Sequence, residues 1–297
     1  MFDFHTHTKA SDGNDPAKKV IELAIKERLS MLAITDHNVI HEELPELQEA
    51  YKDQIQLVNG CEISTIYRPE LGKREEVHVV ALDFDNSSLL PIVSQNYFDR
   101  EQYVKEIVAK LAKCGIIVPS LKELKDLYPQ NENIGRERIA EYLVEKGYTA
   151  DVEEAKYLYL SSKGERRAYV DALDYAHYLS FDEAVRAVMD SGGIPVLAHL
   201  FSYHLSEREC LQLAERFRIL TDAYPSAMEV YYRRYDEETM KKLREIADKM
   251  ELYYSIGSDY HGKETDDLMQ VSEIDEEGRK KLVSNLLKKE KRRDNHE

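Results

Sequence analysis

Short apolar segments that are typical of buried β-strands recur along this sequence, and helical patterns follow most of them. Seven such segments are expected, at residues 2–4, 31–34, 55–58, 77–82, 194–198, 227–230 and 252–256. Strands that alternate with helices indicate an α/β protein. If the strands close into a (β/α) barrel, their carboxyl ends meet at one mouth and gather residues that are far apart in sequence.

Histidine and acidic residues lie at the ends of these segments or within them. His5 and His7 stand two positions apart at the end of the first strand, so their imidazoles should point the same way. Asp259 and His261 repeat this spacing after the last strand. The other residues of metal-ligand type are Asp12, His37, Glu62, His78 and His199. Nitrogen and oxygen ligands without thiolates suit Mn²⁺, Zn²⁺ or Fe²⁺.

Each of these residues also has an ordinary interpretation when it is taken alone. A histidine inside an apolar strand, such as His78, is often a core residue, and Asp36 suits a helix cap or a partner of a ligand. The sequence contains no serine–histidine–aspartate order, phosphate-binding glycine loop or zinc-finger spacing. The metal-site interpretation therefore rests on the whole set rather than on one motif.

Composition excludes several classes of function. The chain has 297 residues, which we interpret as one large domain with an insertion. Its net charge of −16 argues against electrostatic binding to long duplex nucleic acid. Its three cysteines form no C-x-x-C pair, as expected of a reduced cytoplasmic protein. No apolar run approaches the roughly 20 residues of a membrane span, so we expect no membrane partner.

The periodicity becomes helical in the middle of the chain, at residues 100–178. We expect an all-helical insertion there, and a barrel domain formed by residues 1–99 and 179–297. The insertion carries Arg136, Arg138 and Lys163, which we predict to bind the substrate, together with Arg166 and Arg167. Arginine and lysine near glycines suit anions. The alternative is that these charges are only solvated.

Several motifs, in this order and spacing, resemble those of the PHP (polymerase and histidinol phosphatase) family. They are H-T-H-T, I-T-D-H, G-x-E-I-S, V-H-V-V-A-L, the histidine after P-V-L-A, and G-S-D-x-H. The insertion motif R-x-R-I-A-E-Y-L-V-E-K-G resembles the branch with AMP and 3′,5′-bisnucleotide phosphatases, some of which are also 5′-to-3′ exoribonucleases. The resemblance implies a distorted seven-stranded, TIM-like (β/α) barrel with a trinuclear metal centre.

The resemblance also implies a role for each motif residue. The first metal position matches His5, His7, Glu62 and Asp259, and Glu62 would bridge to a second metal at His78 and His199. The third position matches Asp12, His37 and His261, which are grouped with Glu62 as the catalytic residues. Two departures are visible: Leu200 replaces a proline, and Ser202 is the residue nearest to an expected arginine.

From this reasoning we expect a phosphoesterase that binds two to three divalent metal ions and hydrolyses a small phosphomonoester. The expected substrate is AMP or a 3′,5′-bisphosphonucleotide, attacked by a metal-bridging hydroxide. Short oligoribonucleotides are a second class of partner. The alternatives are a histidinol-phosphate-type phosphatase, a short-RNA 5′-to-3′ exonuclease, an amidohydrolase, and a non-catalytic metal-binding regulatory module.

Overall fold

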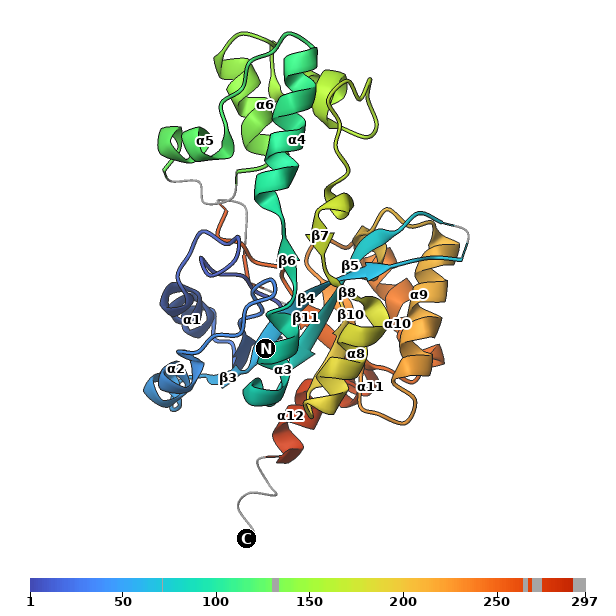
Figure 1. Cartoon of the computed structure of the whole chain (residues 1–297). Coiled ribbons are helices and arrows are strands. Elements are labelled where there is room, and N and C mark those ends of the chain that lie inside the picture. The colour runs from blue at the N-terminus through green and yellow to red at the C-terminus, as the bar shows by residue number, and fades with distance from the viewer. Residues whose placement is uncertain (71, 130–133, 264–266, 269–273, 291–297) are drawn as a thin grey trace. The chain divides into compact units, whose positions relative to one another are not determined.

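The computed structural model describes residues 1–70, 72–129, 134–263, 267–268 and 274–290 (Figure 1). The chain divides into two compact units. The main unit consists of Met1–Asn96 together with Tyr178–Glu297, and the inserted unit of Tyr97–His177. Among the described residues, no helix is both long and apolar enough to cross a membrane.

Two sheets form the frame of the main unit, which is a mixed α/β structure. The smaller sheet is parallel and contains β1 (Phe2–Asp3), β2 (Met31–Ala33) and β3 (Gln56–Val58). The larger sheet has six strands in the order β11 (Tyr253–Gly257), β10 (Ala227–Tyr232), β9 (Ile194–Leu197), β5 (Glu75–Leu82), β4 (Gly60–Tyr67) and β8 (Leu179–Ser180).

The two sheets adjoin at two places. An isolated parallel bridge joins Thr6, beyond β1, to Tyr260, beyond β11, and a second joins His37, beyond β2, to Glu62 in β4. The backbone N–H of Phe4 also donates to the carbonyl of Ile256 over 2.9 Å. These links hold the segments that follow β1, β2 and β11 next to one another.

Strand β5 departs from the parallel pattern of a (β/α) barrel. It runs antiparallel to both β4 and β9, with Ser64 opposite His78 and Val80 opposite Val196. Residues 68–74 join β4 to β5 without a helix, and such a short connection can only return the chain antiparallel. Glu62 also differs from the expectation, because it lies inside the eight-residue β4 rather than at the end of the preceding strand.

Successive residues of a strand point to opposite faces of the sheet, so the hydrophobic residues of the strands divide into an inner and an outer cluster. The inner cluster takes residues from both sheets, including Met31, Ala33, Val80, Leu82 and Val196. The outer cluster takes the residues between them, such as Val79, Ala81 and Leu197. Because Glu62 and His78 lie in step with Val80, both side chains are on the inner face.

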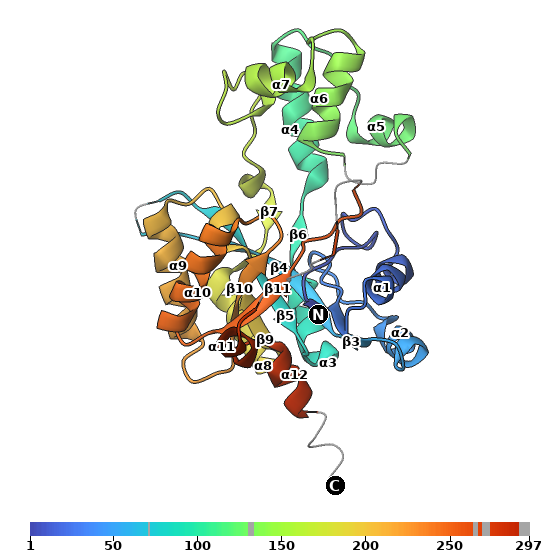
Figure 2. The ribbon, with the colours of Figure 1, turned by 180° about the vertical axis from the view of Figure 1, so that it is seen from behind.

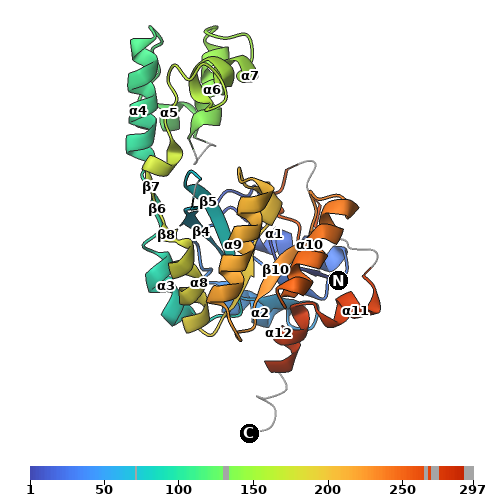
Figure 3. The ribbon, with the colours of Figure 1, turned by 90° about the vertical axis from the view of Figure 1, so that its right-hand side faces the viewer.

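Amphipathic helices cover the outer face of the sheets. Figures 1 to 3 show α8 (Phe181–Asp190), α9 (Glu207–Leu220) and α10 (Glu237–Lys249) along the larger sheet, and α1 (Ala17–Lys26) and α2 (Leu44–Tyr51) beside the smaller one. Capping boxes begin α8 at Ser180 and Glu183, and α9 at Ser206 and Glu209. The remaining helices of this unit are α3 (Asn86–Val93), α11 (Glu276–Lys280), α12 (Ser284–Glu290) and a 3₁₀ turn at Leu200–Ser202.

The inserted unit has its own hydrophobic core, formed among others by Ile107, Leu111, Ile139 and Leu143. Its helices are α4 (Arg100–Lys113), α5 (Leu121–Leu127), α6 (Arg136–Glu145) and α7 (Val152–Ala155), followed by a π-helical turn (Lys156–Leu160) and a 3₁₀ turn (Ala172–Asp174). The unit is not all-helical as expected. It begins and ends in the antiparallel pair β6 (Tyr97–Phe98) and β7 (Ala176–His177). The unit also begins at Tyr97, three residues before the expected start of the insertion.

Candidate metal centre

The segment after β1 places two imidazoles in the interior of the main unit. His5 and His7 are both almost completely buried, and their ring centroids are 5.2 Å apart. The backbone N–H of His7 donates to the carbonyl of Tyr260 over 2.8 Å, and the N–H of Thr6 donates to the hydroxyl of Thr35 over 3.1 Å. These bonds to both neighbouring segments keep the chain extended, so the two histidines project to one side.

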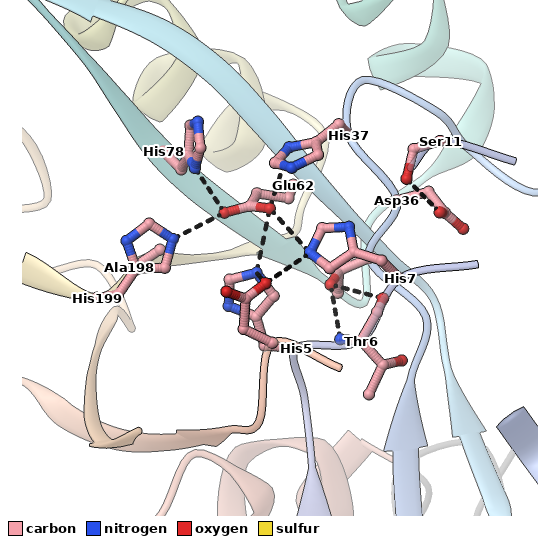
Figure 4. Close-up of polar contacts among 12 residues, drawn as sticks. His5, Thr6, His7, Ser11, Asp36, His37, Glu62, His78, Ala198 and His199 are labelled. Carbon is pink, nitrogen blue, oxygen red and sulfur yellow. Dashed lines mark hydrogen bonds and ion pairs between the residues drawn. The ribbon is translucent and has the colours of Figure 1, made fainter. Parts of the chain in front are cut away.

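Glu62 lies at the centre of the site (Figure 4). Its side chain is 1% exposed. Its two carboxylate oxygens stand 2.9–3.2 Å from ring nitrogens of five residues, which are His5, His7, His37, His78 and His199. One carboxylate with an oxygen toward each side has the arrangement expected of a bridging ligand.

Asp12 and Asp259 extend the cluster on the side of His7. His261 Nε2 is 3.2 Å from Asp12 Oδ2, and His7 Nδ1 is 3.6 Å from Asp12 Oδ1. His7 Nε2 is 3.2 Å from Asp259 Oδ1. Asp259 adopts a left-handed backbone conformation, with φ of 55°, which an aspartate tolerates better than most residues.

All nine residues that the sequence singled out as ligands therefore lie in one cluster, which we call the nine-residue cluster. Their donor atoms form four groups in which all atoms are within 4.8 Å of one another. The groups are His7, Asp12, His37 and His261; His5, His7 and Asp259; His5, Glu62 and His199; and His37, Glu62 and His78. Glu62, His5, His7 and His37 each belong to two groups, as residues between neighbouring cations would.

Unpaired buried atoms indicate that these groups fit cations. Of the buried side-chain atoms without an aligned hydrogen-bond partner among the described residues, seven belong to the cluster: His5 Nε2, both ring nitrogens of His7, His37 Nδ1, Glu62 Oε2, His78 Nδ1 and His199 Nδ1. Each unsatisfied buried polar atom costs about 1–3 kcal/mol. Ligands held at about 2.0–2.2 Å from one Zn²⁺-sized ion stand roughly 3.0–3.5 Å apart, close to the observed spacings. A bound cation would satisfy these atoms.

The charges of the cluster also favour a cation. Burial alone would lower the pKa of His7 and His78, but contacts with Asp259 and Glu62 raise that of His7 to about 9, and the charge of Glu62 raises that of His78 to about 10. Burial works against ionised Glu62, yet the neighbouring imidazoles hold its pKa well below the usual range. Burial lowers the pKa of His37 to about 4 against the opposing charge of Glu62. The carboxylates thus favour positive charge at the site. When no metal is bound, protons on the histidines provide that charge.

Glu229 is a buried carboxylate that the sequence did not single out. On β10, its Oε1 lies 3.0 Å from His5 Nδ1, and its Oε2 accepts the backbone N–H of His199 over 2.8 Å. A proton on Nδ1 of His5 leaves Nε2 free to bind metal. Gly257 provides the space, because a Cβ there would meet Glu229 Oε1 at 1.9 Å. The strand position of Glu229, two residues after Ala227, gave no sign of this role.

Asp36 orients the loop that carries Asp12. It accepts hydrogen bonds from the backbone and hydroxyl of Thr8 and from the hydroxyl of Ser11, and its Oδ2 contacts His41 Nε2. Burial raises the pKa of Asp36, but the bonds from His41, Ser11 and Thr8 prevail and bring it to about 2. Of the two interpretations left open for Asp36, a partner that supports a ligand fits these contacts, and a helix cap does not.

The sequence-predicted substrate residues all lie in the inserted unit. Arg136 and Lys163 are exposed. The Arg138 guanidinium pairs with Glu141 and Glu145, and it covers the ring of Tyr128 with its Cζ 3.5 Å from the centroid. Arg138 therefore already has two carboxylate partners within its own unit.

An α/β frame with a buried cluster of histidines and carboxylates at the strand ends defines the class of metal-dependent hydrolases. Comparisons with known proteins agree and name the family. The family model described as "PHP domain" matches residues 3–148. The match covers just under half of the chain, which is a metal-dependent phosphoesterase similar to proteins of the PHP family.

Two similar proteins indicate the range of activities among relatives. The chain is 28% identical to the 5′-3′ exoribonuclease Rnm of Escherichia coli, over 88% of this chain and 85% of the relative. It is 26% identical to the 3′,5′-nucleoside bisphosphate phosphatase of Chromobacterium violaceum, over 87% of this chain and 86% of the relative. Both alignments extend over the main unit and the inserted unit.

Two solved structures share the fold. A putative metal-dependent phosphoesterase from Bifidobacterium adolescentis superposes with a TM-score of 0.66 and 25% identity, covering 95% of each chain. A Chromobacterium violaceum structure described as an amidohydrolase, with bound sulfate and no metal, gives a TM-score of 0.72 at 24% identity, covering 97% of this chain and 95% of the other. The second likeness concerns the fold alone.

Proposed function

We propose that this chain hydrolyses the phosphomonoester of a small nucleotide, AMP or a 3′,5′-bisphosphonucleotide. The observation that carries the proposal is Glu62, whose two oxygens face five imidazoles inside the nine-residue cluster. When bound there, two to three Mn²⁺, Zn²⁺ or Fe²⁺ ions would activate water at neutral pH and offset charge on the phosphoryl oxygens. The nine residues hold the ions, and Glu229 fixes the ring of His5.

The relatives support a nucleotide over other phosphate esters. One is named for a nucleoside bisphosphate and the other for RNA, so both act on a phosphate next to a ribose. A 5′-to-3′ exonuclease acting on short RNA is the second candidate function, and it rests on the name of the first relative. Both activities use the same attack on phosphorus and differ in the leaving group.

We place the nucleotide selectivity of the inserted unit on two arginines that share one tyrosine. The Cζ atoms of Arg136 and Arg166 are 6.0 and 4.6 Å from the ring centroid of Tyr169, so the two cations lie within about 11 Å of each other. Neither has a carboxylate partner among the described residues, whereas Arg167 pairs with Glu165. Arg136 also begins α6, whose N-cap Gly135 offers no capping side chain, and a helix N-terminus favours an anion.

This proposal keeps Arg136 and adds Arg166 to the sequence-based set. Arg138 and Lys163 stay predictions, because nothing in the structure tests their binding of substrate. Arg138 would have to leave Glu141 and Glu145 to bind a phosphate. Lys163 is exposed and follows the Ser161 turn, where its backbone N–H donates to the hydroxyl of Ser161.

For the main unit we propose that the sheets together form the distorted seven-stranded barrel expected from the sequence. In support, hydrogen-bonded pairs and the two isolated bridges connect the strands in one order. This order is β1, β2, then β3 and β4, which are consecutive in the chain, and then β5, β9, β10 and β11. The inner cluster of residues from both sheets fills the interior such a ring would have.

The test is release of inorganic phosphate from a panel of nucleotides, short oligoribonucleotides and sugar phosphates, with Mn²⁺, Zn²⁺ and Mg²⁺ compared. We expect the highest kcat/KM on AMP or a 3′,5′-bisphosphonucleotide. Release of mononucleotides from short RNA would favour the exonuclease, and release of ammonia from amide or amine substrates would favour an amidohydrolase. Metal binding without turnover of any substrate would contradict the enzyme proposal and leave a regulatory module.

A further inference from the structure

Arg234 lies in the turn that follows β10, at the border between the nine-residue cluster and solvent. Its Nη2 is 3.2 Å from Oδ2 of Asp259, while Oδ1 of the same carboxylate is 3.2 Å from His7 Nε2. The side chain of Arg234 is 53% exposed, whereas that of Asp259 is 11% exposed. A guanidinium that is anchored to a buried ligand and open to solvent has donors left for a solute.

Asp259 does not depend on Arg234 alone for a partner. Its Oδ2 also accepts the hydroxyl of Tyr232 over 2.8 Å, from a side chain that is 1% exposed. The Arg234 Cζ lies 5.9 Å from the centroid of this tyrosine ring, which places the cation beside the ring. Among the residues that the structure describes, Asp259 is the one carboxylate that pairs with Arg234. Most of its five N–H donors therefore remain available.

A cation on the protein would add to the attraction that bound metal ions exert on a phosphate at this site. The cluster contributes three carboxylates, and the buried Glu229 lies next to them. The chain that follows His199 provides no compensating cation, because residues 200–206 read L-F-S-Y-H-L-S. Arg234 brings a permanent cation to the same border from a different strand end, and its planar fork matches two oxygens of a phosphate.

We propose that Arg234 binds a non-bridging oxygen of the substrate phosphate at the edge of the cluster, and so determines selectivity for a phosphate dianion. This inference rests on the proposed function for the identity of the substrate. It assigns a phosphate contact to the main unit itself, independent of Arg136 and Arg166 in the inserted unit. The competing role is a clamp that only orients Asp259.

The experiment compares Arg234→Gln and Arg234→Lys with the matched control Arg233→Gln. Arg233 precedes Arg234 in the same turn, and its substitution removes the same charge. Its Nη1 lies 4.0 Å from Oδ2 of Asp267, whereas Arg234 contacts Asp259. Three quantities are measured on metal-loaded protein: the Kd of inorganic phosphate by calorimetry, the metal content by elemental analysis, and kcat/KM on AMP and on p-nitrophenyl phosphate.

We expect Arg234→Gln to weaken phosphate binding about 10- to 150-fold, the range for a charged hydrogen bond, and to lower kcat/KM on both esters similarly. Both esters present the same phosphate, so the loss should not depend on the nucleoside. Metal content should stay at the wild-type value. Arg234→Lys should recover part of the affinity, since it restores the charge without the fork. Arg233→Gln should match wild type.

Unchanged phosphate affinity in Arg234→Gln would overturn the inference. Loss of bound metal in that variant would also overturn it, because the arginine would then act as the clamp on Asp259. A separate result bears on the proposed function. If wild type releases no phosphate from any ester while Arg234→Gln still binds phosphate more weakly, the anion contact stands and the proposed reaction fails.

Discussion

The nine-residue cluster and the basic side chains of the inserted unit are built in different ways. Eight of the nine cluster residues come from strands or the segments that directly follow them, and Asp12 comes from a loop tied down by Asp36. Their positions are fixed by backbone bonding and burial. Arg136 and Arg166 lie on exposed backbone and are positioned by one aromatic ring.

The difference follows from the ligands that each site would bind. A cation that loses its water needs several donors already in place, which burial and a rigid sheet provide. A phosphate that enters and leaves needs exposed donors that retain contact with water. We therefore expect changes in the cluster to remove metal and activity together, and changes in the inserted unit to alter substrate preference while metal content stays constant.

The largest effect is expected for Glu62→Gln, which keeps the shape of the side chain but removes the charge. Because Glu62 faces five imidazoles, we expect more than one metal ion to be lost and activity to fall by more than the roughly 100-fold that removal of a supporting partner causes. Elemental analysis and phosphate release measure these two effects. A Glu62→Gln protein with full metal content would show that the carboxylate is not a bridge.

A smaller effect is expected for Glu229→Gln. An amide can accept from His5 Nδ1–H or from the His199 N–H through its oxygen, but its NH₂ group then faces the other donor. We expect metal affinity to fall about 10- to 100-fold, as for other second-layer partners of ligating histidines. Competition with a chelator measures the affinity, and nitrogen NMR shifts of His5 report its tautomer.

Gly257→Ala provides a second check on the contact between Glu229 and His5. Its Cβ would meet Glu229 Oε1 at 1.9 Å and the Cβ of His5 at 2.5 Å without changing any charge, so it should lower metal affinity in the same direction. Wild-type metal affinity in both variants would remove Glu229 from the site and leave it as a structural residue of β10.

In the inserted unit, Arg136→Ala and Arg166→Ala should each lower kcat/KM on the best nucleotide by about 10-fold, the low end for a charged hydrogen bond because both side chains are exposed. Activity on p-nitrophenyl phosphate and metal content should change little. Arg167→Ala is the matched control, since Arg167 is already paired with Glu165. Equal losses on both substrates would contradict a role in nucleotide selection.

The last expected effect concerns pH rather than a substitution. In the metal-free protein the pKa of His7 is raised to about 9 and that of His78 to about 10, so both rings are protonated at pH 7. A metal must displace these protons, and its apparent affinity should rise with pH by up to about tenfold per unit for each proton released. Chelator competition at pH 6.5, 7.5 and 8.5 measures this slope. A flat profile would mean that the rings are neutral before metal binds.

Much of the site could be predicted because its members stand in short-range patterns. The spacing of His5 and His7 fixes a common direction for both rings on an extended segment, and the structure has that arrangement. Residues after apolar strands, such as His199 and Asp259, are recognisable for the same reason. Each of these inferences needs only the local period of the chain and the rule that the carboxyl ends of barrel strands meet at one mouth.

Other features could not be read from local patterns. The place of β5 between β4 and β9 depends on its pairing with β9, more than 100 residues away. Its pairing with β4 explains why His78, near the start of β5, lies beside Glu62. Glu229 and Arg234 are ordinary charged residues in sequence. Their roles come from contacts with His5 and Asp259, which only the sheet order brings to them.

The sequence by itself thus determined an α/β chain with nine residues of metal-ligand type, because residue type and the periods of strands and helices, two and about 3.6 residues, are local properties. The tertiary structure decided which ligands share a group, that Glu62 stands between five imidazoles, and which arginines are already paired with acids. Those outcomes depend on short distances between residues far apart in sequence, such as the 3.2 Å between His7 Nε2 and Asp259 Oδ1, and only strand pairing and packing set them.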